Sequence, residues 1–337
     1  MENRREILCV DILNQFRLNN EEKEDPDAAI GRVSEEIKRF VKLCRRKYEI
    51  IGFIDHGITT KETDDKWEVR RIEELKDGRR NCLLNVQTIL GEIFQSVGVP
   101  IHYSTVDCDD TIAAFAYHMN GSVLSKDSDF FRYYVDIRDY EEMRPPYRIY
   151  SGFKMDKKGG NFSLKDHGGL RHDKIRYRAS PVKILDTFPK TRDNTYSLPE
   201  IPDFIEKPAG VDLMYVSGCG SNLTQEPNPN LVARPLRQAL YSRMDYGPVL
   251  ERLAHWDPIT GATFIKEVVE PDNTLHHLLD NPKKAFKKIF GESINKMKPE
   301  YTEEEWRTHV FCQKSAIAKL CAWANPSRGY LNILGEI

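Results

Sequence analysis

The sequence lacks an uninterrupted apolar run as long as the roughly 18 residues of a membrane-spanning helix, so we expect no membrane partner. The segment from Met1 to Glu6 also lacks the apolar stretch of a secretory signal, and we therefore expect an intracellular protein of the nucleus or cytoplasm. None of the seven cysteines forms a CxxC pair, which indicates reduced, buried thiols instead of a disulfide framework. None of the nine histidines has the spacing of a zinc ligand.

The chain has no large excess of charge of either sign. Its 50 Lys and Arg residues face 52 Asp and Glu residues, which gives a formal net charge of −2. A nucleic-acid partner is therefore neither required nor excluded, and any phosphate binding must come from local basic patches. The 337 residues, 40% of them hydrophobic, are enough for one or two domains with a sizeable core.

Short β-like runs alternate with helical patterns through the first 130 residues. This alternation predicts right-handed βαβ units and a parallel sheet. Apolar residues with a 3–4 spacing mark the buried faces of the helices. Strands are predicted at about 7–13, 49–54, 99–103 and 122–125, and helices at about 30–44, 59–80, 83–97 and 109–117.

The pattern changes after residue 130. Short alternating segments rich in Tyr, Arg, Gly and Pro predict hairpins or an irregular β-rich insertion at about 131–196, and helical patterns dominate from Asn230 onward. We therefore predict an α/β fold, in which a mostly parallel twisted sheet flanked by helices occupies residues 1–225. A mainly helical C-terminal region would occupy residues 226–337.

Six aspartates follow the predicted strands. The carboxyl ends of parallel strands lie at one edge of a sheet, and carboxylates gathered there repel one another unless a cation neutralises them. An Asp-x-Asp pair lets two carboxylates reach a shared ion. One Asp at a strand end is commonly a helix cap, but caps do not require such pairs. We expect the set to bind one or two Mg²⁺ or Mn²⁺ ions and to be catalytic: Asp11, Asp55, Asp107, Asp109, Asp127 and Asp129.

Four motifs around these aspartates resemble, in order and spacing, those of the PIN-like XPG/flap-endonuclease superfamily. The four motifs are Asp11-Ile12-Leu13-Asn14, Phe53-Ile54-Asp55-His56-Gly57, Asp107-Cys108-Asp109 and Ser125-Lys126-Asp127-Ser128-Asp129. Farther along, the segment from Leu231 to Tyr241 and the run from Val249 to Arg252 are similar to the Asteroid branch. That branch includes the constitutive coactivator of PPAR-gamma-like proteins.

The resemblance covers roughly residues 5–255 and implies a PIN-like fold with metal-dependent cleavage of DNA or RNA, single-stranded or with a flap or branch. The third motif of the family usually begins with Glu, where this chain has Asp107. Gly220 stands where the family normally has a last carboxylate, so the second ion is in question. This chain also begins close to its first strand, without the short family segment that lies in the active site.

Basic residues in two segments are candidates for phosphate binding. The first group consists of Lys66, Arg70 and Arg71. It lies where flap-endonuclease-like proteins place a basic arch, although the interleaved Glu residues also fit a charged helix face. The second group consists of Arg171, Lys174 and Arg176 and lies beside Tyr177. It fits a surface that binds the nucleic-acid backbone and stacks its bases, or an exposed hairpin edge whose charges prevent pairing with another strand. The candidates are Lys66, Arg70, Arg71, Arg171, Lys174 and Arg176.

A third basic segment runs from Lys283 to Lys288, where a solvated helix face is the simpler interpretation.

Two functions therefore remain open from the sequence. The first is a structure-selective nuclease that uses Mg²⁺ or Mn²⁺. The second is a nuclease-fold protein without activity that binds nucleic acid or acts as a scaffold, with a protein partner on the C-terminal helices.

Overall fold

The computed structural model describes residues 5–18, 25–55, 85–104, 107–133, 145–156, 161–167, 212–216, 229–257, 259–291 and 301–337, with single residues at 69, 72, 73 and 76. The chain forms two units. The first comprises residues 1–17, 32–63 and 93–202, and the second comprises 18–31, 64–92 and 203–337. The domain boundary expected near residue 225 stays a prediction. In the described part of the chain, no helix is long and apolar enough to cross a membrane.

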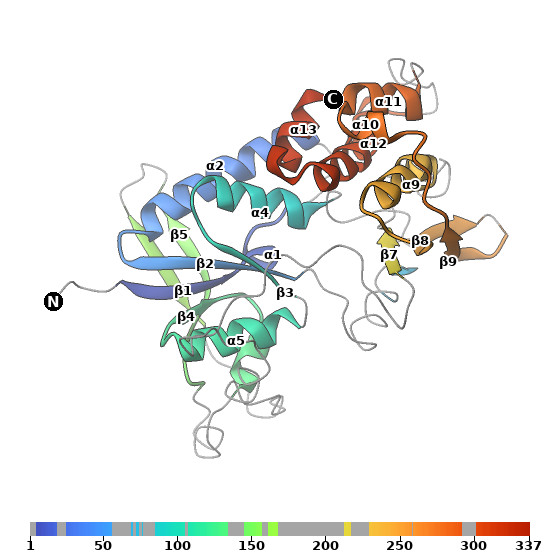
Figure 1. Cartoon of the computed structure of the whole chain (residues 1–337). Coiled ribbons are helices and arrows are strands. Elements are labelled where there is room, and N and C mark those ends of the chain that lie inside the picture. The colour runs from blue at the N-terminus through green and yellow to red at the C-terminus, as the bar shows by residue number, and fades with distance from the viewer. Residues whose placement is uncertain are drawn as a thin grey trace. The chain divides into compact units, whose positions relative to one another are not determined.

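A six-stranded sheet forms the centre of the first unit, with the strand order β3-β2-β1-β4-β5-β6 (Figure 1). All neighbouring strands pair in parallel except β5 and β6, which pair antiparallel. The strands are β1 (Glu6–Asp11), β2 (Tyr48–Asp55), β3 (Ile101–Ser104), β4 (Ser122–Leu124), β5 (Arg148–Met155) and β6 (Phe162–Asp166). The prediction of a mostly parallel central sheet is confirmed.

Helices cover both faces of this sheet, because successive side chains of a strand point to opposite faces. On one face, Cys9, Phe53 and Val123 share a core with α5 (Cys108–His118). On the other, the Phe16 ring lies 5.3 Å from the ring of Phe40 in α2 (Pro26–Cys44). The same ring lies 5.2 Å from Phe94 in α4 (Val86–Ser96) and 5.5 Å from Phe153 in β5. The α/β class is therefore confirmed.

Two element boundaries differ from the sequence-based expectation, and an aspartate cap explains each. The first strand ends at Asp11 and not at residue 13, because the Asp11 carboxylate accepts from the backbone N–H of Asn14 and begins α1 (Ile12–Gln15). The helix expected from about residue 109 begins at Cys108, because Asp107 caps α5 by accepting from the N–H of Asp109. In both cases the carboxylate satisfies an amide that the first helical turn leaves unpaired.

The region at 131–196 contains the predicted hairpin, formed by β5 and β6, and β5 also extends the parallel sheet beside β4. The short 3-10 helix η1 (Ser128–Arg132) connects β4 to this region. The remaining residues of this segment, and the predicted helix at 59–80 apart from four single residues, lie outside the described part of the chain.

The second unit contains a three-stranded sheet with the order β7-β8-β9, in which β7 and β8 are parallel and β8 and β9 antiparallel. Its strands are β7 (Asp212–Val216), β8 (Val249–Asp257) and β9 (Gly261–Val269). Its helices are α8 (Pro229–Val232), α9 (Arg234–Arg243), α10 (His276–Leu279), α11 (Pro282–Phe290), α12 (Glu303–Ala324) and α13 (Tyr330–Glu336), with the 3-10 helix η4 (Pro326–Arg328). The region after residue 226 is mainly helical, as predicted.

The β8–β9 hairpin was not predicted. In β8, Val249 and Leu253 are fully buried, and the position between them on the same face is Glu251, which is only 1% exposed. A charged residue at a buried position hides the apolar alternation by which a half-buried strand is recognised in a sequence.

Replacement of Gly121 by Ala should lower the free energy of unfolding by about 1–3 kcal/mol, because it overpacks the start of β4. An added β-carbon would lie 2.8 Å from the backbone oxygen of Ile7 and 3.2 Å from its Cβ, and neither atom can turn away. Gly31→Ala is the matched control, since its β-carbon meets nothing within 4 Å on an exposed face of α2. It should stabilise by about 0.5–1 kcal/mol. Urea unfolding measures both, and equal midpoints would contradict this packing.

Candidate functional site

The six aspartates lie at the carboxyl edge of the parallel strands of the first unit. Asp11 and Asp55 are the last residues of β1 and β2, which are neighbours. Asp107 and Asp109 follow β3 at the start of α5, and Asp127 and Asp129 follow β4 at the start of η1. From β1, the chain adds β2 and β3 on one side of the sheet and then β4 on the other side of β1. The order of the strands therefore reverses beside β1. Such a switch point leaves a crevice outside the strand ends where ligands bind.

The carboxylates lie within electrostatic range of one another. Burial raises the pKa of Asp11 from its ordinary value of 3.8 to about 6. Hydrogen bonds from Ser125 and Asn14 lower this pKa, whereas the charges of Asp127 and Asp55 raise it. The first unit therefore holds its Asp11 carboxylate among other negative groups.

The negative charges of these carboxylates also affect the thiol of Cys108. Burial raises the pKa of Cys108 well above its ordinary value, and the charges of four carboxylates raise it further: Asp11, Asp55, Asp109 and Asp107. The charges of four of the six aspartates thus act on one buried side chain. At neutral pH the thiol stays protonated, because a thiolate there would face several negative charges in a poorly solvated position.

Ser125 and Asn14 join the ends of β1 and β4. The Ser125 hydroxyl donates to Asp11 Oδ2 over 2.8 Å and accepts from the N–H of Asp127 over 3.1 Å. The N–H of Lys126 donates to Asn14 Oδ1 over 2.8 Å. Ser125 and Asn14 both belong to motifs identified in the sequence, but no role was predicted for either residue. Their positions directly beside the strand-end aspartates were the available signal.

Three of the six aspartates are helix caps. Asp11 caps α1, Asp107 Oδ1 accepts from the N–H of Asp109 over 3.1 Å, and Asp127 Oδ1 accepts from the N–H of Asp129 over 2.9 Å. The first carboxylate of each Asp-x-Asp pair therefore forms a local capping turn, whereas the cap uses only the backbone N–H of the second aspartate and does not account for its carboxylate. Each of these cap bonds uses one carboxylate oxygen, so capping and cation binding are compatible.

The neighbouring aspartates have further partners. Asp129 Oδ2 lies 2.9 Å from Arg132 Nη1, and both side chains are partly exposed. Asp110, which follows Asp109 in the first turn of α5, accepts a hydrogen bond from the hydroxyl of Tyr133. Asp110 therefore has a local structural contact beside the six-residue set.

The donor chemistry of the set fits a hard divalent cation, since carboxylate oxygens are the ligands that Mg²⁺ and Mn²⁺ prefer. As these side chains stand, no three His, Cys, Asp or Glu residues within the described part of the chain are grouped closely enough to hold an ion.

The basic candidates Lys66, Arg70, Arg71, Arg171, Lys174 and Arg176, and also Gly220, lie outside the described residues. Their proximity to the aspartates stays a prediction. Two described basic residues were not singled out from the sequence: Lys126, whose side chain is exposed, and Arg132, the partner of Asp129.

No protein-family model matches this chain, and no curated protein is significantly similar to it. Among solved structures, the catalytic core of Rad2 in complex with DNA substrate is similar, with a TM-score of 0.30 and 13% sequence identity. The match covers 48% of this chain and 49% of the Rad2 chain, so this chain spans about half the length of that structure. A likeness at this TM-score identifies no family for this chain.

Proposed function

We propose that this protein is a PIN-like nuclease of the XPG/flap-endonuclease type, which hydrolyses phosphodiester bonds of DNA or RNA with Mg²⁺ or Mn²⁺. The observation that supports it most is the placement of six aspartates at the carboxyl edge of four parallel strands, on both sides of the switch point beside β1. A cluster of like charges destabilises a fold unless a cation compensates it, because close charges repel strongly where water is scarce. This placement is therefore better explained by cation binding than by capping alone.

In this proposal, one ion would be held chiefly by Asp11, Asp55, Asp107 and Asp109, and a second by Asp127 and Asp129. A bound divalent cation supplies positive charge that polarises the phosphate and stabilises the charge developing in the transition state. Ser125 positions the cluster, because its hydroxyl fixes Asp11 Oδ2 and the backbone of Asp127 at the same time.

The nucleic acid is proposed to be single-stranded, or to carry a flap or branch. Its phosphates would contact the basic residues of two segments, as the family resemblance implies: Lys66, Arg70, Arg71, Arg171, Lys174 and Arg176. Basic side chains beside the site would neutralise the backbone and hold the scissile bond in place.

A nuclease-fold scaffold without activity is the second candidate. It is favoured by two observations: three of the aspartates already serve as caps, and no three acidic side chains of the described residues are gathered around one point. Such a protein would bind nucleic acid without cutting it, or a protein partner through the C-terminal helices.

The two candidates separate in a cleavage assay with Asp109→Asn and a matched control, Asp110→Asn. Labelled single-stranded, flap and hairpin DNA and RNA are incubated with Mg²⁺, Mn²⁺ or EDTA. We expect cation-dependent cleavage that falls at least about 100-fold in Asp109→Asn. Asp110→Asn should keep its activity, since an amide oxygen still accepts the Tyr133 hydroxyl.

Two results would count against the nuclease. One is the absence of cation-dependent cleavage of every substrate by the unmodified protein. The other is cleavage that Asp109→Asn and Asp110→Asn support equally. Either result favours the scaffold.

A further inference from the structure

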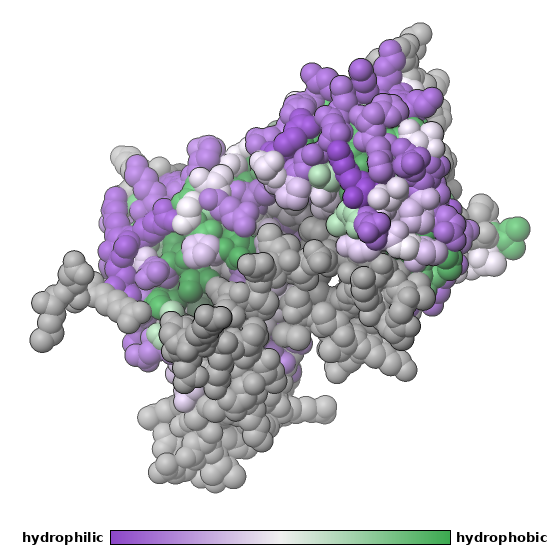
Figure 2. Space-filling view, viewed as in Figure 1, coloured by the Kyte–Doolittle hydropathy of each residue, from purple (hydrophilic) through white to green (hydrophobic). Residues whose placement is uncertain are grey.

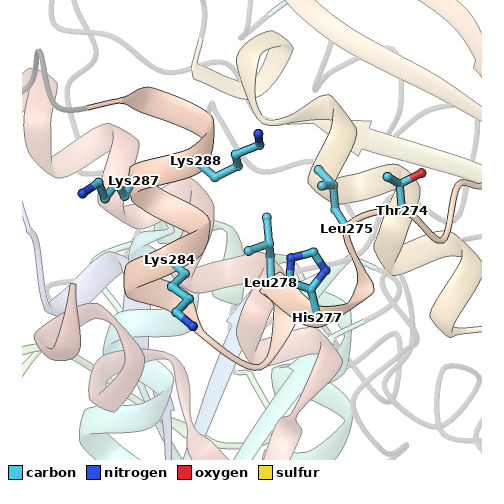
Figure 3. A pocket seen from close by; sticks show the side chains of 7 residues that line it. All are labelled: Thr274, Leu275, His277, Leu278, Lys284, Lys287 and Lys288. Carbon is cyan, nitrogen blue, oxygen red and sulfur yellow. The ribbon is translucent and has the colours of Figure 1, made fainter.

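The second unit has a basic pocket between α10 and α11, with a volume of about 580 Å³ (Figure 3). Its size lies within the range of small-molecule sites, which is about 300–1,000 Å³. Three of its lining side chains are lysines, a fourth is a histidine, and none is acidic. The pocket is lined by Thr274, Leu275, His277, Leu278, Lys284, Lys287 and Lys288.

The lysines project from a well-anchored helix. The Asn281 side chain caps α11 by accepting from the N–H of Lys284 over 3.1 Å, and Ala285 is fully buried. Gly291, with a φ of 76°, ends the helix and donates its N–H to the carbonyl of Lys287. The positions from which the cations extend are therefore fixed, even though the lysine side chains themselves are long.

Lys284 and Lys288 face the pocket together. They are four residues apart on α11, a spacing that brings two side chains to the same helix face and makes like charges repel. Figure 3 shows Lys288 extending toward the side on which Leu275 lies and Lys284 extending downward, whereas Lys287 extends to the other side of α11. An anion between Lys284 and Lys288 would relieve their repulsion.

Two carboxylates near the pocket in sequence, Asp272 and Asp280, are engaged elsewhere. Asp280 pairs with Arg243 of α9 over 2.7 Å. Asp272 accepts both the hydroxyl and the N–H of Thr274, and it does not line the pocket. Neither of these two contacts places a carboxylate against Lys284 or Lys288, and a bound anion would supply negative charge beside them.

We infer that this pocket binds the phosphates of a single-stranded nucleic acid. Five of the seven lining residues are exposed and Leu278 is buried, so the pocket has an open, cationic rim above an apolar floor. An open rim admits a passing strand, and the His277 ring and the leucines offer a surface for a base. Lysines bind phosphate as point charges, whereas carboxylate recognition favours the planar fork of arginine, which the lining lacks.

The surface around α11 is mainly hydrophilic, as Figure 2 shows for the helices of the second unit. Such a surface suits a wet, salt-dependent contact with a polyanion better than it suits an apolar protein interface. The inference does not depend on the proposed nuclease activity, because the pocket and the aspartate edge belong to different units.

Fluorescence anisotropy with labelled oligothymidylate and oligouridylate tests the inference. EDTA is present and the protein carries Asp109→Asn, so cleavage does not contribute. Lys284→Gln/Lys288→Gln should weaken binding about tenfold or more at about 50 mM salt. It should also lower the salt slope by about 1.4, which is about 0.7 for each phosphate that is no longer neutralised. Lys266→Gln/Lys283→Gln is the control, because it removes the same charge from exposed positions outside the pocket.

Three outcomes would overturn the inference. The two double variants could bind equally well, or the unmodified pocket could show no salt-dependent binding of either oligonucleotide. The third outcome is that labelled oligoglutamate binds through Lys284 and Lys288 more tightly than the oligonucleotides do, which would assign the pocket to acidic peptides. Circular dichroism of each variant confirms that it is folded, and the cleavage assay is scored separately.

Discussion

Asp11→Asn is expected to stabilise the cation-free protein at neutral pH and to abolish the gain in stability that Mg²⁺ or Mn²⁺ provides. The pKa of Asp11 rises from 3.8 to about 6 on folding, chiefly through burial and partly through Asp127 and Asp55. The folded state therefore binds the proton more tightly than the unfolded state does. Below about pH 4 the carboxyl group is protonated in both states and costs no stability, and between about pH 4 and pH 6 the cost of ionising it in the folded state grows to its full size of about 3 kcal/mol.

Asparagine removes this penalty and keeps the local structure. It caps a helix as well as aspartate does, and its amide oxygen can accept from the N–H of Asn14. Because the amide can replace only part of the Ser125 contact, the net gain should be about 1–2 kcal/mol at pH 7.5. At pH 4 the two proteins should differ little.

Urea unfolding at pH 4.0 and 7.5, each with EDTA or Mn²⁺, measures these effects. The unmodified protein should gain stability from Mn²⁺ at pH 7.5 and lose most of that gain at pH 4.0. Asp110→Asn serves as the control and should keep the gain. Lower stability of Asp11→Asn at pH 7.5 in EDTA would contradict the electrostatic description of this edge.

Arg237→Leu should lower the free energy of unfolding of the second unit by about 3–5 kcal/mol. Arg237 and Glu251 are each 1% exposed, and two hydrogen bonds of 2.6 and 2.7 Å join them. The Tyr241 hydroxyl donates to Glu251 over 2.8 Å, and Arg234 Nε lies 3.1 Å from it. Without Arg237, the buried carboxylate keeps only these weaker partners.

The charges of this network are mutually dependent. Burial alone would raise the pKa of Glu251, but the hydrogen bonds and charge of Arg237 hold it below its ordinary value. Loss of the guanidinium therefore leaves a carboxylate that must stay charged in a dry site or take up a proton. Both alternatives cost stability.

Arg243→Leu is the matched control for Arg237→Leu, since both positions lie in α9 and both changes are identical. Arg243 pairs with Asp280 over 2.7 Å, but the two side chains are 31% and 52% exposed, so the loss should be at most about 1 kcal/mol. Arg237→Leu/Glu251→Leu should recover much of the stability, because no buried charge is left unpaired. Equal effects of the two single changes in urea unfolding would refute the network.

Most of the first unit could be predicted from apolar runs and their spacing. The strands β1 to β4 were placed to within about two residues, because apolar runs mark most of their length. The first strand was extended too far since Ile12 and Leu13 continue its apolar run, although the Asp11 cap has already turned the chain. The β8–β9 hairpin was missed because Glu251 occupies a buried position that pattern reading assigns to solvent.

The candidate site could be predicted only in part. The predicted strand ends indicated the six aspartates as site residues. No spacing rule connects Asp11 with Ser125, because Ser125 lies 114 residues later and is brought to Asp11 by the pairing of β1 with β4. Nor could the sequence show that Asp107 and Asp127 close local turns. The roles of the six aspartates and of the six basic candidates remain predictions.

The pair formed by Arg237 and Glu251 also has a consequence for how this protein can diverge. A chain that loses either residue first becomes less stable before it can acquire the compensating change, so single replacements are selected against. The two positions are therefore expected to be inherited together or exchanged together. Tyr241, which donates to the same carboxylate, should tolerate phenylalanine less well if Arg237 alone is lost, and better once both charged residues have been replaced by apolar ones.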